Sequence, residues 1–321
     1  MNQRFHKHRV LLILIIVPVF AVLLVFSKLE RALCAENQKS KIENRKLKIQ
    51  RIVSLSPNLT EIVFALGLGD KVVAVSNNCD WPAEAKTRQK VGTFWQPDTE
   101  AIVATRPDLV ICESFEQQRA VAETLKRIGL EVLMLRIESI EELFSAIAKI
   151  GQAAGCGDGA EELIADIRGR LDRIRKTSSS AGKVKVLWVM QNEPLRVAGV
   201  KTFINEIVEL AGGQNAIAPT VDLYPSVGTE EILLCGAEVI IQSAMGKQDI
   251  LKQQAEAEQF WSRFSNLPAV KNKRIYVIDP DAVFRLGPRL PQGAQAVAEC
   301  LHPESFANPE NINQATKLKD D

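Results

Sequence analysis

Few side chains in this sequence suit covalent catalysis, because its histidines lie near the two ends of the chain. They are His6, His8 and His302. Their positions argue against histidine-based acid–base catalysis, activated Ser or Cys nucleophiles, and His-ligated zinc or haem in the central region. No phosphate-binding loop or nucleophile-elbow motif occurs. The sequence therefore predicts no catalytic residues, no resident metal site and no cofactor.

Aromatic residues in loops suggest the binding of a flat ligand instead. Trp81 and the pair Phe94-Trp95 follow expected strands, at the edge of a parallel sheet where open α/β folds bind ligands. Rings placed there can stack on a planar molecule while a few polar groups orient it. The alternative is that Trp81 and Phe94 only fill the top of their own lobe.

Polar candidates for the same ligand lie in the second half of the chain. Tyr224 is one of two tyrosines, and Asp281 and Arg285 follow the last expected strand. Asp281 and Arg285 are four residues apart, so they can form an ion pair on one helix turn. The functional alternative is that they hydrogen-bond the polar substituents of a ligand.

One phrase of the sequence occurs twice, 130 residues apart. Residues 99–111 (TEAIVATRPDLVI) match residues 229–241 (TEEILLCGAEVII) without a gap. Each copy predicts an acidic helix start, a short helix, a break and a buried strand. The partial positive charge of a helix N-terminus favours Glu100 or Glu230 individually, but it does not explain why the unit recurs. The repeat predicts two similar lobes, each with one glutamate at the same surface position.

The elements around these residues alternate as strands and helices. A strand at 52–55, a helix that starts at Pro57 after an N-cap at Ser56, and a strand at 72–75 predict a right-handed parallel βαβ unit. Further expected elements are helices near 115–128, from Ser139 and at 203–210, and strands at 132–135, 184–190 and 275–278. Glycines at 155, 157 and 159 predict a turn, and a long helix follows them.

These patterns predict two α/β lobes with parallel sheets, joined by one long rigid helix, with a ligand cleft between the lobes. The expected segments are an export signal or anchor (1–35), a polar linker (36–50), the first lobe (51–155), the connecting helix (156–182), the second lobe (183–302) and a polar tail (303–321).

The N-terminus predicts export. Three basic residues before position 10 precede an apolar run at 10–26, and small residues follow at 32 and 35. The run also approaches the length needed to cross a bilayer, so an uncleaved membrane anchor is the alternative. Arg31 and Leu33 argue against lipidation of Cys34. Either way, residues from 36 onward are expected outside the cytoplasm, in a periplasmic or other extracytoplasmic location.

Composition is compatible with this organisation. The chain has 321 residues, 46% of them hydrophobic, which suffices for two lobes. Lys and Arg number 40 and Asp and Glu 39, so the net charge of +1 gives no reason to expect a nucleic-acid partner. No two cysteines have C-x-x-C spacing, and Cys112 and Cys235 are expected to be core residues.

Four segments resemble the helical-backbone class of ABC-transporter substrate-binding proteins. They are residues 51–61 (RIVSLSPNLTE), the turn 80–82 (DWP), the first copy of the repeat, and residues 285–289 (RLGPR). The resemblance covers residues 51–301 and is strongest to members that bind vitamin B12. It implies a corrinoid, haem or ferric siderophore ligand in a shallow cleft, and docking of Glu100 and Glu230 onto arginines of a membrane permease.

The resemblance also implies ligand contacts. Cobalamin-contacting positions fall on Asn78, Phe94, Glu113, Met190, Tyr224, Asp281 and Arg285, and Trp95 lies beside Phe94. Asp281 and Arg285 keep the residue types of the B12 binders, whereas Asn78, Glu113 and Met190 replace aromatic residues. A disulfide of those proteins is not expected, because Ala211 replaces its first cysteine.

The sequence therefore predicts an exported, monomeric, non-enzymatic protein that captures a corrinoid and delivers it to the permease dimer of an ABC importer. The metal is expected to arrive with the ligand. A ferric-siderophore or haem binder is the first alternative, and a membrane-anchored sensor and an extracytoplasmic enzyme on the same scaffold are the others.

Overall fold

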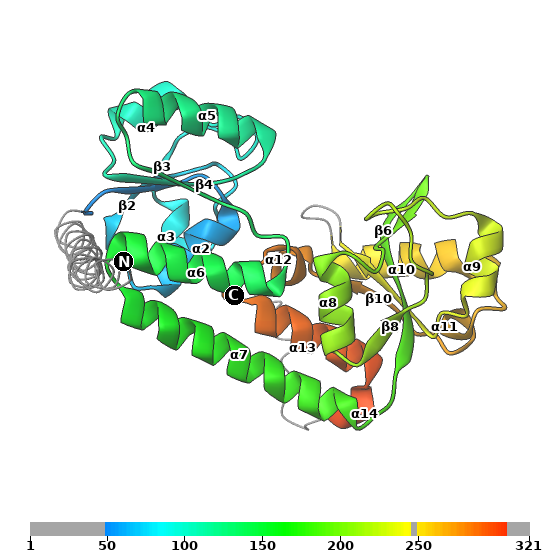
Figure 1. Ribbon diagram of the computed structural model, residues 1–321. Helices are drawn as coiled ribbons and strands as arrows, with labels where there is room; N and C mark the ends of the chain where they lie inside the picture. Colours follow the sequence, from blue (N-terminus) through cyan, green and yellow to red (C-terminus); the bar gives the residue numbers. More distant parts are fainter. Residues whose placement is uncertain (1–48, 245–248, 307–321) are drawn as a thin grey trace, which may run out of the picture. The chain divides into compact units, whose positions relative to one another are not determined.

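The computed structural model describes residues 49–244 and 249–306, and its strands form two sheets (Figure 1). The first sheet has the order β3-β2-β1-β4-β5, and the second has the order β10-β9-β6-β7 with β8 also paired to β6. The strands of the first sheet are β1 (Ile52–Ser54), β2 (Val72–Val75), β3 (Gln89–Lys90), β4 (Leu109–Glu113) and β5 (Val132–Leu135). Those of the second are β6 (Val184–Asn192), β7 (Leu195–Val197), β8 (Gly213–Asn215), β9 (Val239–Ser243) and β10 (Ile275–Ile278).

All pairs in the first sheet are parallel, and helices cover both of its faces (Figure 1). The helices are α2 (Pro57–Ala65), α3 (Ala83–Lys86), α4 (Thr99–Ala104), α5 (Glu116–Arg127) and α6 (Ile140–Ala154), with a 3-10 turn at Gly69–Lys71. Apolar residues of the strands, such as Val53 and Val110, pack with Ile102 of α4 and Leu125 of α5 in one buried cluster. The strands β1, β2, β4 and β5 are mainly apolar, as expected of parallel strands covered on both faces, whereas the short edge strand β3 is polar and exposed.

The second sheet repeats this plan with an added hairpin. All its pairs are parallel except that between β6 and β7. Its core includes Trp261, whose indole N–H donates to the Gln242 side chain at 2.9 Å. The helices of this half are α8 (Phe203–Leu210), α9 (Thr229–Cys235), α10 (Ile250–Trp261), α11 (Pro268–Lys271), α12 (Pro280–Phe284), α13 (Leu290–Leu301) and α14 (Pro303–Phe306), with a 3-10 turn at Ser262–Phe264.

The two copies of the repeated phrase occupy equivalent places. In each, a short helix (α4 or α9) is followed by a strand (β4 or β9) that pairs in parallel with the first strand of its sheet. Both helices end before a residue with positive φ, Arg106 at 49° and Gly236 at 63°, which are equivalent positions in the repeat. The fold class predicted from the sequence, two α/β units with parallel sheets, is confirmed.

Two local expectations need correction. The sequence predicts a turn across 155–159, but only Gly155 and Cys156 separate α6 from α7 (Gly157–Ser179), so two of the glycines lie in the first turn of α7. A left-handed φ of 77° at Gly155 accomplishes the change of direction in one residue. Ser56 is the N-cap residue of α2 by position, but its side chain makes no capping hydrogen bond.

The long helix expected after the turn is α7, which packs against α8, α13 and α14. The expected signal or anchor and most of the linker lie outside the described residues, as does most of the tail. Among residues 49–244 and 249–306, no helix is both long enough and apolar enough to cross a membrane.

Candidate functional site

Most of the candidate ligand-binding residues follow the carboxyl ends of parallel strands, as the sequence predicts. Asn78 lies after β2, Phe94 and Trp95 after β3, and Glu113 is the last residue of β4. In the second half, Asp281 and Arg285 follow β10. Loops at this edge of an open α/β sheet form ligand sites because the strands end there together.

The aromatic loop residues form a cluster. The ring of Phe94 lies 4.8 Å from Trp95 and 4.7 Å from Phe115 between ring centroids, and Trp95 lies 5.3 Å from Phe115. Trp95 is nevertheless 60% exposed, so much of its indole meets solvent although Phe94 and Phe115 contact it. Trp81 is 50% exposed and does not fill the top of its lobe, whereas Phe94 is half-buried within the ring cluster.

Gln118, which is fully buried on α5, positions this cluster. Its side-chain N–H groups donate to the carbonyls of Leu55 at 3.1 Å and Phe94 at 2.9 Å. Its side-chain oxygen accepts from the Glu113 backbone N–H at 2.7 Å and from the Ser56 hydroxyl at 3.3 Å. One amide thus ties together the ends of β1 and β4 and the aromatic loop, and it explains why the Ser56 hydroxyl does not cap α2.

Asn78 joins the same group, because its side-chain oxygen accepts from the Phe94 backbone N–H at 2.8 Å. The loops after β2 and β3 are therefore held together by one side chain from the predicted site. The Asn58 side chain hydrogen-bonds the carboxyl of Glu113.

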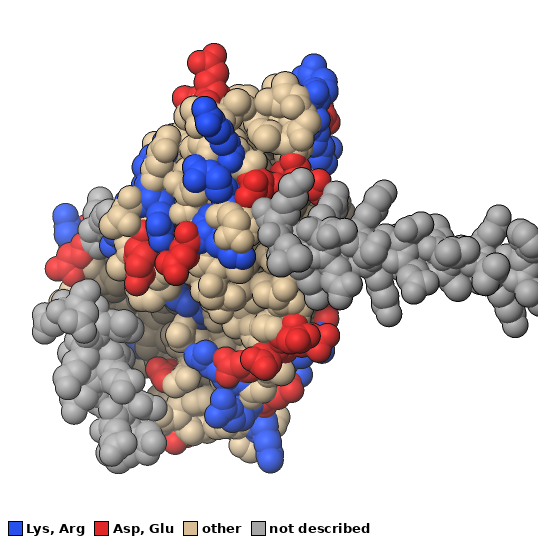
Figure 2. All heavy atoms as spheres, turned by 90° about the vertical axis from the view of Figure 1, so that its left-hand side faces the viewer, with Lys and Arg blue, Asp and Glu red and all other residues tan. Residues whose placement is uncertain are grey.

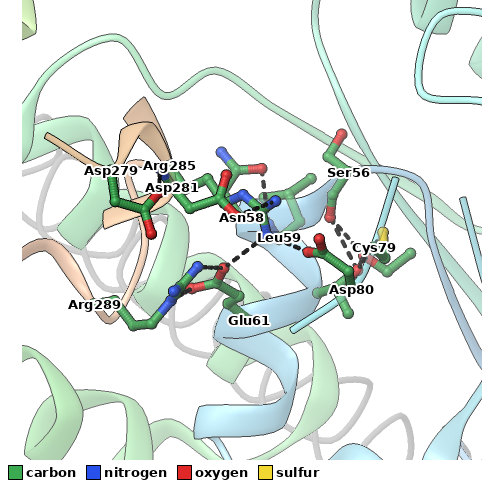
Figure 3. Close-up of polar contacts among 12 residues, drawn as sticks. Ser56, Asn58, Leu59, Glu61, Cys79, Asp80, Asp279, Asp281, Arg285 and Arg289 are labelled. Carbon is green, nitrogen blue, oxygen red and sulfur yellow. Dashed lines mark hydrogen bonds and ion pairs between the residues drawn. The ribbon is translucent and has the colours of Figure 1, made fainter. Parts of the chain in front are cut away.

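Arg285 is the centre of a second, charged group (Figure 3). Its guanidinium lies 2.6 Å from Asp80, 2.9 Å from Asp281 and 3.5 Å from Glu61. Arg289 binds both oxygens of Glu61, at 2.7 and 3.0 Å, and its guanidinium lies 4.8 Å from the ring centroid of Trp81. The expected pair of Asp281 and Arg285 therefore forms, within a larger network.

The charges of this network shift the pKa values of its members. Burial alone would raise the pKa of Asp80, but the hydrogen bond and charge of Arg285 outweigh burial and lower it. For Asp281, burial and the nearby carboxylates of Asp279 and Asp80 raise the pKa against the attraction of Arg285. Burial alone would lower the pKa of Arg285, but the Asp80 hydrogen bond and the surrounding carboxylates raise it.

Glu113 and Tyr224 share an electrostatic neighbour. Burial raises the pKa of Glu113. The hydrogen bond with Asn58 opposes this shift in part, and the negative charge of Glu138 adds to it. Burial, followed by the same Glu138 charge, raises the pKa of Tyr224. Both side chains are therefore more readily kept neutral than in water.

Two candidates stand apart from these groups. Met190 lines a cavity of about 310 Å³ beside Gln242, Ser243 and Val277, at the carboxyl ends of β6, β9 and β10. Within the described residues, neither Met190 nor Tyr224 forms a hydrogen bond, ion pair or ring contact with the other predicted site residues. A further cavity of about 470 Å³ lies beside Trp81, Glu61 and Arg289.

Glu100 and Glu230 occupy the second position of α4 and α9, and both are exposed. Neither carboxylate has an ion-pair partner in the part of the chain that the structure describes. Figure 2 shows acidic and basic side chains interspersed over the face it presents, without a large patch of one sign.

Sequence reasoning did not single out Glu61, Asp80, Arg289, Phe115 or Gln118. Three of them lie inside the segments that carry the family resemblance, at 51–61, 80–82 and 285–289. Charged residues within such motifs were the available signal for Glu61, Asp80 and Arg289. The sequence gives no comparable signal for Gln118 and Phe115, because their partners come close only when the sheet folds.

With this geometry in place, comparison with known proteins identifies the family. A model described as periplasmic binding protein matches residues 52–282. The chain belongs to the periplasmic binding protein family. Proteins of this family are the substrate-binding components of ABC importers. They are non-enzymatic, act outside the cytoplasm and serve a membrane permease.

Three similar proteins illustrate the range of the family. An uncharacterized ABC transporter substrate-binding lipoprotein, YvrC of Bacillus subtilis, is 33% identical over 80% of this chain and 81% of its own length. The vitamin B12-binding protein of Vibrio parahaemolyticus is 29% identical over 80% of this chain and 90% of its own length. A solved periplasmic haem-binding protein of Pseudomonas aeruginosa has a TM-score of 0.69 and 27% identity, covering 80% of this chain and 94% of that one.

Proposed function

We propose that this protein captures a corrinoid outside the cytoplasm and delivers it to the permease dimer of an ABC importer. The family gives the transport role, and the proposal adds the ligand and the residues that hold it. In this proposal the ligand-binding residues are Asn78, Phe94, Trp95, Glu113, Met190, Tyr224, Asp281 and Arg285. The protein acts as a monomer, needs no cofactor of its own, and reaches its compartment through the N-terminal segment.

The observation that carries the proposal is the exposed indole of Trp95, supported by Phe94 and Phe115. Aromatic rings prefer offset or edge-to-face contacts with other flat groups, and a half-exposed ring at the edge of a sheet offers such a surface. Gln118 and Asn78 fix the backbone of the aromatic loop, so little ordering is needed when a ligand binds. A broad, planar corrin ring fits this arrangement.

The polar groups of the candidate site suit the amide fringe of a corrinoid. Asp80 and Asp281 carry carboxylates that can accept hydrogen bonds from the amide N–H groups of the ligand. Among residues 49–244 and 249–306, no group of three or more His, Cys, Asp or Glu residues is placed to hold a metal ion. In the proposal, the cobalt comes within the ligand.

A haem or ferric-siderophore binder is the second candidate. The phenol of Tyr224 favours it, because tyrosine can ligate haem iron. Ferric siderophores are commonly anionic, however, and the arginines of the site, Arg285 and Arg289, are already bound by Asp80, Asp281 and Glu61. This balance places the corrinoid first.

Delivery would use Glu100 and Glu230. Three observations support this docking role. The two glutamates occupy equivalent positions in the repeated units, both are exposed, and neither has an ion-pair partner among the described residues. Unpaired surface carboxylates are suited to dock on basic residues of a partner, because pairing costs them no existing contact.

Calorimetric titration of the purified protein with cobalamin, cobinamide, haemin and several ferric siderophores tests the ligand. We expect the two corrinoids to bind more tightly than the iron ligands. Tighter binding of haemin or a siderophore would establish the second candidate instead. Binding of none of these ligands would contradict both.

A further inference from the structure

The charged group around Arg285 is already neutralised by the protein's own carboxylates. Arg285 is 16% exposed and is bound by Asp80, Asp281 and Glu61, while Arg289 is bound by Glu61 (Figure 3). A guanidinium that awaits an anionic ligand would leave its N–H fork open, because bidentate recognition of a carboxylate needs two parallel donors. Here Glu61 occupies the Nε and Nη2 donors of Arg289, and the three carboxylates occupy both Nη groups of Arg285.

The count of charges in this group leaves an excess of negative charge. Three carboxylates, those of Glu61, Asp80 and Asp281, face two guanidiniums, so the net charge is one negative unit. Further charges act on its members: Lys86 on Asp80, and Asp279 on Asp281. One is positive and one negative, so the excess persists. An anionic ligand placed here would be repelled rather than attracted.

The exposed sides of the group are carboxylates. Asp80 and Asp281 are 42% and 43% exposed, more than twice the exposure of Arg285. Each uses one oxygen in its ion pair with Arg285, and a carboxylate has about four lone-pair sites in all. A ligand that approaches this group therefore meets hydrogen-bond acceptors, which suit N–H groups on the ligand's rim.

We propose that Asp80 is a specificity-determining residue: as a built-in counter-ion for Arg285, it makes the site accept uncharged or cationic ligands with N–H donors and reject chelates with anionic rims. The inference rests on the proposed function and narrows its ligand class. To bind a rim carboxylate, Arg285 would have to release Asp80 from a contact of 2.6 Å. Specificity then arises from a group that penalises the wrong ligand as well as from contacts to the right one.

Asp80 is the appropriate position for the test. It is half-exposed in a loop, so Asp80→Asn removes one charge while the side-chain oxygen can still accept from Arg285. Glu61 is unsuitable because its side chain is only 2% exposed and also holds Arg289. The matched control is Glu84→Gln, which removes the same charge at an exposed position four residues later and outside the Arg285 group.

The ligands are chosen as pairs that differ in charge alone as far as chemistry allows. The first pair is a corrinoid with intact side-chain amides and the same ring with those amides hydrolysed to carboxylates. The second pair is a neutral ferric trihydroxamate and an anionic ferric tricatecholate. Calorimetry then compares the wild-type protein, Asp80→Asn and Glu84→Gln with each ligand.

We expect the wild type to prefer the uncharged member of a pair that it binds, and Asp80→Asn to reduce this preference at least tenfold. Glu84→Gln should leave the preference within about twofold of wild type. Equal affinity of the wild type for both members, an unchanged preference in Asp80→Asn, or an equal effect of Glu84→Gln would each overturn the inference. If only the iron pair binds, the corrinoid proposal fails, but the preference within that pair still decides the role of Asp80. Binding of neither pair would overturn both.

Discussion

The guanidinium of Arg289 holds both carboxylate oxygens of Glu61, at 2.7 and 3.0 Å, although the two residues are 228 positions apart in the chain. Glu61 lies on α2, and Arg289 directly precedes α13. Only 2% of the Glu61 side chain is exposed, and Arg289 and Arg285 are the ion-pair partners of its carboxylate. The pair links segments from the first and last parts of the described chain.

Removing Arg289 should therefore destabilise the protein strongly. In Arg289→Ala the carboxylate of Glu61 stays buried with only the 3.5 Å contact to Arg285, and breaking such a buried pair costs about 3–5 kcal/mol. We expect a loss of about that size in the free energy of unfolding, measured with urea. The control is Arg175→Ala, which breaks an exposed pair with Asp172 and should cost less than about 1 kcal/mol. Equal losses in the two variants would contradict the importance of the buried pair.

Local signals in the sequence predicted the elements well. Glycines and prolines bound short apolar runs, so β2, β5 and β10 and the helix α8 have the predicted limits. Ser56 shows where local reasoning fails. The residue type and position predict a cap, but the buried oxygen of Gln118, 62 residues later, accepts the hydroxyl hydrogen bond instead. The capping hydrogen bond that the local sequence predicts is thus replaced by a hydrogen bond that forms only in the folded protein.

The positions of the candidate residues could be predicted in part for the same reason. Loops after strands could be recognised, so the sequence places Phe94 and Trp95 after a strand, where the structure has them. The motif at 80–82 marks Asp80, but its pairing with Arg285, 205 positions away in the sequence, becomes visible only in the folded protein. Gln118 connects the ends of β1 and β4, and this role could be recognised only once the pairing of these two strands was known.

Gln118 provides the second stability prediction. Gln118→Ala leaves the Phe94 and Leu55 carbonyls and the Glu113 N–H without their partner. Each unsatisfied buried group costs about 1–3 kcal/mol, so we expect a loss of about 2 kcal/mol or more in the free energy of unfolding. Ligand affinity should fall as well, because the loop with Phe94 is no longer fixed. Gln117→Ala, at an exposed neighbour, should leave both quantities unchanged, and a similar effect there would contradict the role of Gln118.

Trp95 should contribute to binding without contributing much to stability. Its ring is mostly exposed, so Trp95→Ala removes little buried surface in the free protein. We expect ligand affinity to fall about tenfold or more, equivalent to about 1.4 kcal/mol, and the melting temperature to stay close to wild type. Trp95→Phe should recover most of the affinity. Truncating another exposed apolar residue, in Ile128→Ala, should not change binding; an unchanged affinity in Trp95→Ala would contradict the stacking surface.

Reversing the charge of the two repeated glutamates separates docking from binding. Glu100→Arg together with Glu230→Arg should abolish uptake of the ligand by cells while its affinity for the purified protein remains intact. Glu116→Arg is the control, because it reverses an exposed charge in the first turn of α5 and so carries the same helix-dipole cost of roughly 0.3–1 kcal/mol. Reduced affinity in the double variant, or lost uptake in the control, would contradict docking through these residues.

Glu113 should make stability depend on pH in a specific direction. Burial raises its pKa in the folded protein, so ionisation is less favourable there than in the unfolded chain. At a pH above both pKa values, ionisation of Glu113 therefore favours unfolding, and below the unfolded value of about 4.3 it contributes nothing. Glu113→Gln removes this penalty and can still hydrogen-bond Asn58. We expect its melting temperature to exceed that of the wild type at pH 7, with a gap that closes as the pH falls toward 4.

Asn58→Ala, which removes the hydrogen bond that lowers the pKa of Glu113, should steepen the loss of stability as the pH rises. A gap between Glu113→Gln and wild type that stays constant from pH 4 to pH 8 would show that packing, rather than ionisation, sets the difference.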